Sequence, residues 1–216
     1  MSLLNQLERK LYKFRIQPFY KYLIFAMGGV YLLNLFFPTF NLIYRLSLIR
    51  DRVLAGEIWR LVTFLFVPLA SNPMYTFLAL YFYYFIGTTL EARWGARRFF
   101  LFYLIGALGT IIGAFITGYS TNTYLNFSLF FAFALVYPDY EILLFFILPI
   151  KMKWLALING LFFLSSFIYQ PWSEKIAIII SLANIILFFG GDILNKIRQT
   201  IYQWKRRRQF RSSFKK

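Results

Sequence analysis

Residues 57–98, EIWRLVTFLFVPLASNPMYTFLALYFYYFIGTTLEARWGARR, decide how the whole chain is interpreted. A charged turn that contains Trp59 and Arg60 leads into residues 61–70, an apolar run too short to cross a bilayer. Two prolines then interrupt the chain, and residues 74–90 form a longer apolar segment that stops at a cluster of arginines. This order predicts a surface loop, a shallow apolar element and a membrane-spanning helix.

The composition of the chain is typical of a membrane protein. The sequence has 216 residues, of which 60% are hydrophobic and 15% charged, and its mean hydropathy is +0.59. Soluble domains are typically about half apolar and about a quarter charged. The sequence therefore predicts an all-α, polytopic membrane protein whose main partner is the lipid bilayer.

Six segments are apolar and long enough to be predicted as membrane spans. They are residues 22–37, 74–90, 99–119, 124–137, 154–169 and 175–189. The apolar runs 61–70 and 141–148 are each too short to cross. The predicted domain order is a basic amphipathic lead at 1–21, a membrane domain at 22–195 and a basic tail at 196–216.

The net charge of +16 would suggest nucleic acid as a partner in a soluble protein. Here the basic residues lie between and beyond the predicted spans, so we expect them to set membrane orientation and not to bind nucleic acid. With six spans, one side of the membrane receives 19 lysines and arginines and the other receives 5. The positive-inside rule then predicts that both termini are cytoplasmic.

The chain contains no cysteine and no histidine. The missing cysteines exclude disulfides and thiolate chemistry, and the missing histidines remove the usual general base and the commonest metal ligand. We therefore expect no metal site and no cofactor, and an enzyme would have to work without an imidazole.

Small and polar residues inside the spans predict how the helices pack. The small residues expected at helix contacts are Gly106, Gly109, Gly113 and Gly191. Asn126, Asn159 and Asn184 are expected to hydrogen-bond between helices. The acidic residues Glu91 and Asp192 end two spans and are expected to pair with nearby basic residues.

Several short motifs are informative as an ordered set. The set consists of Trp59 and Arg60 in the first loop, Gly87 and Glu91 at the end of the second span, and Gly95 and Arg97 before the third. With six spans, this set resembles the rhomboid family of intramembrane proteases over roughly residues 20–195. The resemblance implies a six-helix rhomboid-like bundle.

Rhomboid proteases use a serine in a Gly-x-Ser-Gly turn at the start of the fourth span and a histidine in the sixth. They also use a histidine and an asparagine in the second span to bind the oxyanion. Ungapped counting places these functions at Thr123, Asn184, Tyr75 and Ala79, none of which matches the required residue type. Ser128 lies one turn deeper, inside a helix. The resemblance therefore implies a pseudoprotease fold without a catalytic dyad.

The sequence leaves alternatives open. A serine–lysine pair is the standard dyad without histidine, and Lys175 with Ser120 or Thr123 is the best placed. A small transporter is disfavoured because no span carries an ionisable residue well away from its ends. The favoured interpretation is a multi-pass protein of a bacterial inner membrane that binds transmembrane segments of client proteins, which approach between the second and fifth spans.

Overall fold

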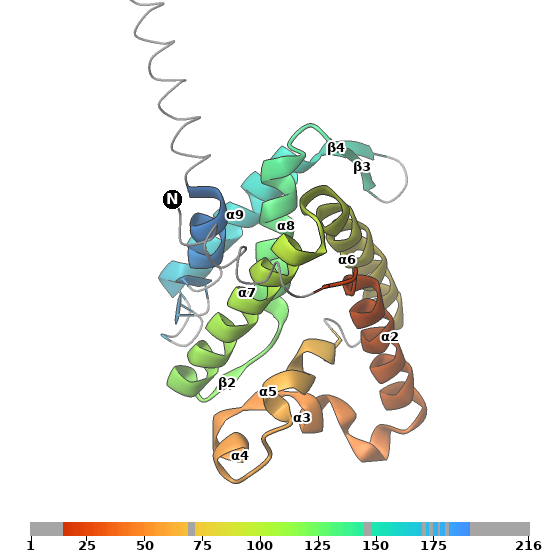
Figure 1. The fold of residues 1–216 in the computed structure, drawn as a ribbon, viewed down its shortest axis with the longest axis vertical. Helices are drawn as coiled ribbons and strands as arrows, with labels where there is room; N and C mark the ends of the chain where they lie inside the picture. The colour runs from red at the N-terminus through yellow and green to blue at the C-terminus, as the bar shows by residue number, and fades with distance from the viewer. Residues whose placement is uncertain are drawn as a thin grey trace, which may run out of the picture.

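The computed structural model describes residues 15–68, 72–144, 148–169, 172, 175, 176, 178, 179 and 182–190. Five long helices follow the predicted spans, and Figure 1 shows them arranged as a bundle. They are α2 (Tyr20–Phe36), α6 (Pro73–Trp94), α7 (Ala96–Thr117), α8 (Thr123–Val136) and α9 (Met152–Tyr169). Residues 182–190 are helical too. The prediction of a helical bundle with these segment positions is therefore confirmed.

The first loop of the sequence is built from short elements. A 105° bend separates α2 from the turns that follow it. The elements are η1 (Pro38–Phe40), α3 (Leu42–Leu46), β1 (Leu48–Ile49), α4 (Arg50–Leu54), α5 (Arg60–Thr63) and η2 (Phe64–Phe66). The run predicted to be too short to cross is thus a single helical turn and a 3-10 turn, ending before Pro68.

Two short antiparallel sheets depart from the all-helical expectation. β1 pairs with β2 (Tyr119–Ser120), and β3 (Glu141–Leu144) pairs with β4 (Leu148–Lys151). β3 lies in the first half of the apolar run 141–148, and β4 begins at the last residue of that run. Ile142 and Ile150 are β-branched, and Pro149 favours an extended chain over a helix.

Contacts between distant segments show which helix ends lie together. The β1–β2 pair brings the first loop to the joint between α7 and α8. At another end of the bundle, the Phe19 amide donates a hydrogen bond of 2.9 Å to Glu91, which joins the start of α2 to the end of α6. Figure 1 shows β3 and β4 far from α3, α4 and α5. The helices therefore run back and forth between two ends.

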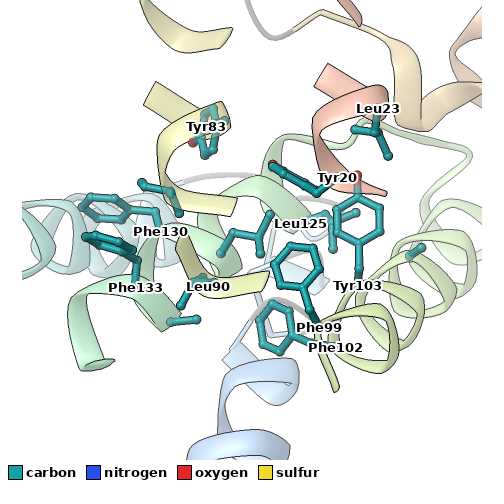
Figure 2. Packing of buried hydrophobic residues seen from close by; sticks show 14 of the residues in the cluster. Tyr20, Leu23, Tyr83, Leu90, Phe99, Phe102, Tyr103, Leu125, Phe130 and Phe133 are labelled. Carbon is teal, nitrogen blue, oxygen red and sulfur yellow. The ribbon is translucent and has the colours of Figure 1, made fainter. Parts of the chain in front are cut away.

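The core lies where α2, α6, α7 and α8 meet. Figure 2 shows aromatic and aliphatic side chains from these helices interlocking around Leu125. Tyr20 packs edge-on against Phe99 and Tyr103, with ring centroids 5.2 and 5.8 Å apart. α8 contacts α6 on one side and α9 on the other, so it lies between them.

By length and composition, two helices of the described residues could cross a membrane: α7 and α9. A third candidate is the bent pair formed by α2 and the turns after it. α6 has 22 residues, as many as α7, but its tyrosines make it less apolar, and α8 has only 14. The number of six spans and the cytoplasmic placement of both termini remain predictions.

Some predicted segments lie outside the described residues. These are most of the lead at 1–21, the residues Gly191 and Asp192, and the tail at 196–216.

Candidate functional site

Gly87 and Glu91 hold the start of α2 against the end of α6. A Cβ at Gly87 would overlap the ring of Tyr20, so only glycine lets α2 approach this closely. One turn later, the Glu91 carboxylate accepts the Phe19 amide and also bonds the backbone of Tyr20. Glu91 thus caps the first N–H groups of α2, which have no partner within the helix. The expected pairing of Glu91 with a neighbouring arginine is not what the structure shows.

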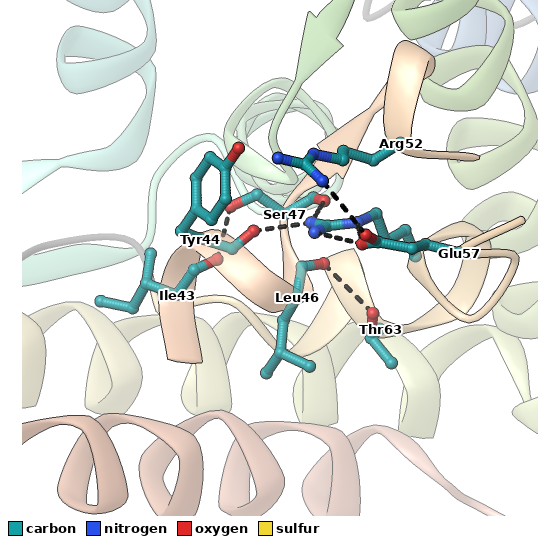
Figure 3. A network of polar contacts seen from close by, with 8 residues as sticks. Ile43, Tyr44, Leu46, Ser47, Arg52, Glu57 and Thr63 are labelled. Carbon is teal, nitrogen blue, oxygen red and sulfur yellow. Dashed lines mark hydrogen bonds and ion pairs between the residues drawn. The ribbon is translucent and has the colours of Figure 1, made fainter. Parts of the chain in front are cut away.

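Arg60 lies inside the first loop, where only 2% of its surface is exposed. Its guanidinium donates to the carbonyls of Tyr44 and Ser47 at 2.6 and 2.8 Å, and pairs with Glu57 at 2.5 Å (Figure 3). Arg52 approaches the other oxygen of Glu57 at 3.7 Å. A buried guanidinium needs a carboxylate and several acceptors, and the loop supplies both. Arg60 therefore stabilises the first loop from the inside.

Trp59 differs from its neighbour because its side chain is exposed. The loop is fixed to the bundle from another direction by Asn122, which precedes α8. The Asn122 amide donates to the carbonyls of Leu65 and Val67 at 3.2 and 2.9 Å. The short apolar element is thus hydrogen-bonded to the start of α8, which no motif in the sequence indicated.

The motif between α6 and α7 forms a tight joint. Gly95 has φ of 81°, a left-handed conformation that favours glycine, and it separates two helices of 22 residues each. Arg97 is half-buried in the first turn of α7. Trp94 packs on Phe102 and Phe189 at 5.5 Å, which connects this joint to the helix at 182–190.

Among the glycines expected at helix contacts, Gly106 lies at a close helix approach. A Cβ there would overlap Leu125 and lie 2.8 Å from the amide nitrogen of Asn184. Gly113 is buried as well, whereas Gly109 is half-buried. The helices α7 and α8 and the helix at 182–190 therefore pack closely around Gly106.

The four positions that counting assigned to catalysis do not come together. Thr123 begins α8 and accepts a hydrogen bond of 2.9 Å from Thr121. Tyr75 is exposed on the first turn of α6, and Ala79 is half-buried against the core. Asn184 is buried, and its side chain is directed to α7 and α8.

The residue that faces Asn184 is Ser128. The Asn184 amide donates to the Ser128 hydroxyl oxygen and to the carbonyl of Phe102, both at 3.4 Å. Ser128 is 1% exposed and Asn184 is 3% exposed. Counting without gaps placed the nucleophile position of the rhomboid proteases at Thr123, five residues before Ser128. The position of a residue along α8 does not by itself show which hydroxyl meets the helix at 182–190.

The contacts of Ser128 determine what its hydroxyl can do. The hydroxyl donates its proton to the carbonyl of Leu125 at 2.7 Å. A serine nucleophile needs a base that removes this proton, and an asparagine amide has no basic atom to do so. The pair formed by Ser128 and Asn184 can therefore connect two helices but has no means of activating the hydroxyl.

The lysine dyad considered from the sequence is not formed among the described residues. The Lys175 amine lies over the rings of Trp172 and Phe167, at 5.0 and 5.9 Å from their centroids. The Ser120 hydroxyl instead has a weak contact of 3.4 Å with the carbonyl of Thr121. The amine is therefore placed for cation–π contacts and is not hydrogen-bonded to the Ser120 hydroxyl.

Two further lysines lie at the β3–β4 end of the bundle. Lys151 approaches Glu141 at 4.0 Å, and Lys153 pairs with Asp139 at 2.7 Å. The Lys153 ammonium, by its hydrogen bond and its charge, holds the pKa of Asp139 below its ordinary value. Among the described residues, no group of three or more acidic side chains is placed to bind a metal ion.

A profile of the family described as Eukaryotic integral membrane protein (DUF1751) matches residues 21–189. No curated protein matches the chain. The match confirms the prediction of a membrane protein. It also corrects one expectation: the family is described as eukaryotic, so the assignment to a bacterial inner membrane is wrong. That assignment depended on the rhomboid resemblance and on amino-acid usage, and neither identifies a source organism.

Proposed function

Because this chain belongs to the family described as Eukaryotic integral membrane protein (DUF1751), we propose a function that is carried out within the bilayer. The protein is a rhomboid-like membrane protein without proteolytic activity, and it holds transmembrane segments of other membrane proteins. Its six spans leave both termini on the cytoplasmic side. The proposal has two parts, the absence of catalysis and the binding of a helix.

The contacts of Ser128 carry the first part. Its hydroxyl proton is given to the carbonyl of Leu125, and its oxygen faces the Asn184 amide, which cannot accept a proton. Removing the base of a catalytic triad lowers the rate by several orders of magnitude. A chain without histidine, in which the buried serine faces an amide, is therefore best understood as a binder.

The arrangement of α6, α8 and α9 supports the second part. α8 lies between the other two helices, and the outer parts of α6 and α9 expose large apolar side chains on either side of it. On α6 these include Met74 and Leu78, and on α9 they include Leu161 and Phe162. A helix that approaches from the lipid between α6 and α9 would meet an apolar surface on both flanks.

Crosslinking inside the membrane tests the binding directly. A photoreactive amino acid is placed at Leu78 of α6 or at Phe162 of α9, and adducts are identified by mass spectrometry. We expect the same discrete set of membrane proteins from both positions. Phe102 of α7 is the matched control, because its ring is fully buried and can reach only this chain.

The result that contradicts the proposal is equally clear. If Leu78 and Phe162 yield only lipid adducts, α6 and α9 face the bilayer and hold no client helix. Adducts with unrelated sets of proteins at the two positions would also contradict it, because a single helix between α6 and α9 must meet both.

A further inference from the structure

One flank of α6 exposes tyrosines to its surroundings. Tyr81 is 64% exposed and Tyr84 is 38% exposed, and their spacing places both on the same face of the helix. The ring of Tyr84 touches Phe25 of α2 with centroids 6.1 Å apart, so this face borders α2. It adjoins the face of Phe82 and Phe85, which contact α8 and Tyr140, because Phe85 follows Tyr81 by one helical turn.

In an α6 that crosses the membrane, as the proposed six spans require, these two tyrosines lie near the middle of the bilayer. α6 has 22 residues, which at about 1.5 Å per residue matches the roughly 30 Å hydrocarbon core of a bilayer. When α6 crosses the membrane, Tyr81 and Tyr84 lie within about 4 Å of its midpoint, as the same rise per residue gives. A tyrosine side chain is much shorter than the distance of about 15 Å to either interface.

The phenol hydroxyls therefore need a partner that the described part of the chain does not provide. Within the described residues neither hydroxyl has a hydrogen bond, and the contact of Tyr84 is through its ring. A hydroxyl in an apolar medium without a hydrogen bond is energetically unfavourable. Lipid tails offer neither donors nor acceptors, so lipid alone leaves this cost uncompensated.

We infer that the α6 face formed by Tyr81 and Tyr84 binds a transmembrane helix of another protein that carries an amide or carboxyl side chain near the bilayer centre. Such a side chain accepts hydrogen bonds from both phenols, while the exposed ring of Phe77 one turn earlier contacts its apolar neighbours. The inference requires α6 to cross the membrane but does not require a client between α6 and α9.

The test uses the whole chain in lipid vesicles with two synthetic helices as probes. One probe is a membrane-spanning leucine helix with a single central glutamine, and the other has leucine at that position. The chain has no cysteine, so Ala92→Cys at the exposed end of α6 gives one site for a fluorophore. Energy transfer to a labelled probe then reports binding to the chain.

We expect the glutamine probe to bind about fivefold more tightly than the leucine probe, the typical size of a polar contact between membrane helices. The double change Tyr81→Phe and Tyr84→Phe keeps the rings and should reduce this ratio to about one. Tyr75→Phe is the matched control, because Tyr75 is 65% exposed but lies at the first turn of α6, near the interface. It should leave the ratio unchanged.

Three results overturn the inference. The first is a ratio near one in the unchanged chain, and the second is a ratio that survives the double change. The third is self-association of labelled chains that the double change abolishes, because the partner is then a second copy. None of these concerns crosslinks from Leu78 and Phe162, so this inference and the proposed function fail separately.

Discussion

α7 and α9 are both long and apolar enough to cross a membrane, yet they are used differently. Half of the residues in the apolar window of α7 are buried inside the protein, against 12% in that of α9. α7 lies in the core, where Phe99 and Phe102 pack against rings from other segments. α9 leaves most of its large side chains exposed.

The difference shows that the apolarity of a helix favours its insertion into the bilayer but does not determine whether it lies at the centre or at the edge of the bundle. What places α7 at the centre is a small residue, Gly106, next to large rings, so that α8 and the helix at 182–190 can approach it. α9 packs through Met152, Leu155 and Ala156 at its start and through Phe163, which meets the edges of Tyr124, Phe127 and Phe131 at 5.0 to 6.0 Å. Its exposed large side chains are open to lipid or a partner.

Removing a large ring from each helix tests the contrast most strongly. Phe102→Ala should lower the free energy of unfolding in detergent by about 3 kcal/mol or more, because it leaves a cavity among Trp94 and Phe188. Phe162→Ala in α9 removes the same atoms from an exposed position and should change the free energy of unfolding by less than about 0.5 kcal/mol. Equal effects would contradict the assignment of α7 to the core.

Adding a methyl group to a glycine of each helix gives the next largest effect. Gly106→Ala should destabilise the protein by about 1–3 kcal/mol, because the new Cβ overlaps Leu125 and crowds Asn184. Gly160→Ala meets nothing within 4 Å and should be neutral or slightly stabilising. Thermal melts of the two variants in the same detergent provide the comparison.

Phe163→Ala should release α9 from α8 without unfolding the core. Aromatic pairs contribute on the order of 1 kcal/mol beyond their buried area, and Phe163 makes three such contacts. Amide hydrogen exchange should therefore rise in residues 152–169 while that of residues 96–117 stays constant. A uniform rise in both helices would mean that α9 is as integral to the fold as α7.

The smallest expected effect concerns the link from α8 to α9. The pKa of Asp139 is lower in the folded protein than in the unfolded chain because Lys153, in α9, stabilises its charged form. This contribution to stability is therefore present above the ordinary aspartate pKa and is lost as the pH falls through the lower, folded value. Asp139→Asn should remove this part of the pH dependence of unfolding, and an unchanged acid profile would contradict the pairing.

Much of the fold could be predicted from the sequence because prolines and charges interrupt the apolar runs at definite places. Pro38 follows the end of α2, Gly95 separates α6 from α7, and Pro138 follows α8. The short sheets could not be predicted, because β1 has only two residues and pairs with a segment about 70 residues away. Short apolar runs such as 141–148 fit a strand or a buried helix equally well.

The candidate site was harder to predict than the fold. Residue types excluded a histidine base, but ungapped counting selected Thr123, whereas the hydroxyl that meets Asn184 belongs to Ser128. Thr123 is at the start of α8, and Ser128 is buried about one helical turn further along. Only the packing of α8 against the helix at 182–190 shows which of the two hydroxyls meets Asn184. The burial of Arg60 could not be predicted either, because it depends on carbonyls of Tyr44 and Ser47 that no motif encodes.

The most direct test of a protein that holds helices without cutting them is covalent labelling of its hydroxyls. The purified chain in lipid is treated with a fluorophosphonate probe, and modified residues are mapped by mass spectrometry. We predict no modification of Ser128, because its proton is bonded to Leu125 and its neighbour is an amide. Labelling of the unchanged chain that disappears in Ser128→Ala would contradict the account.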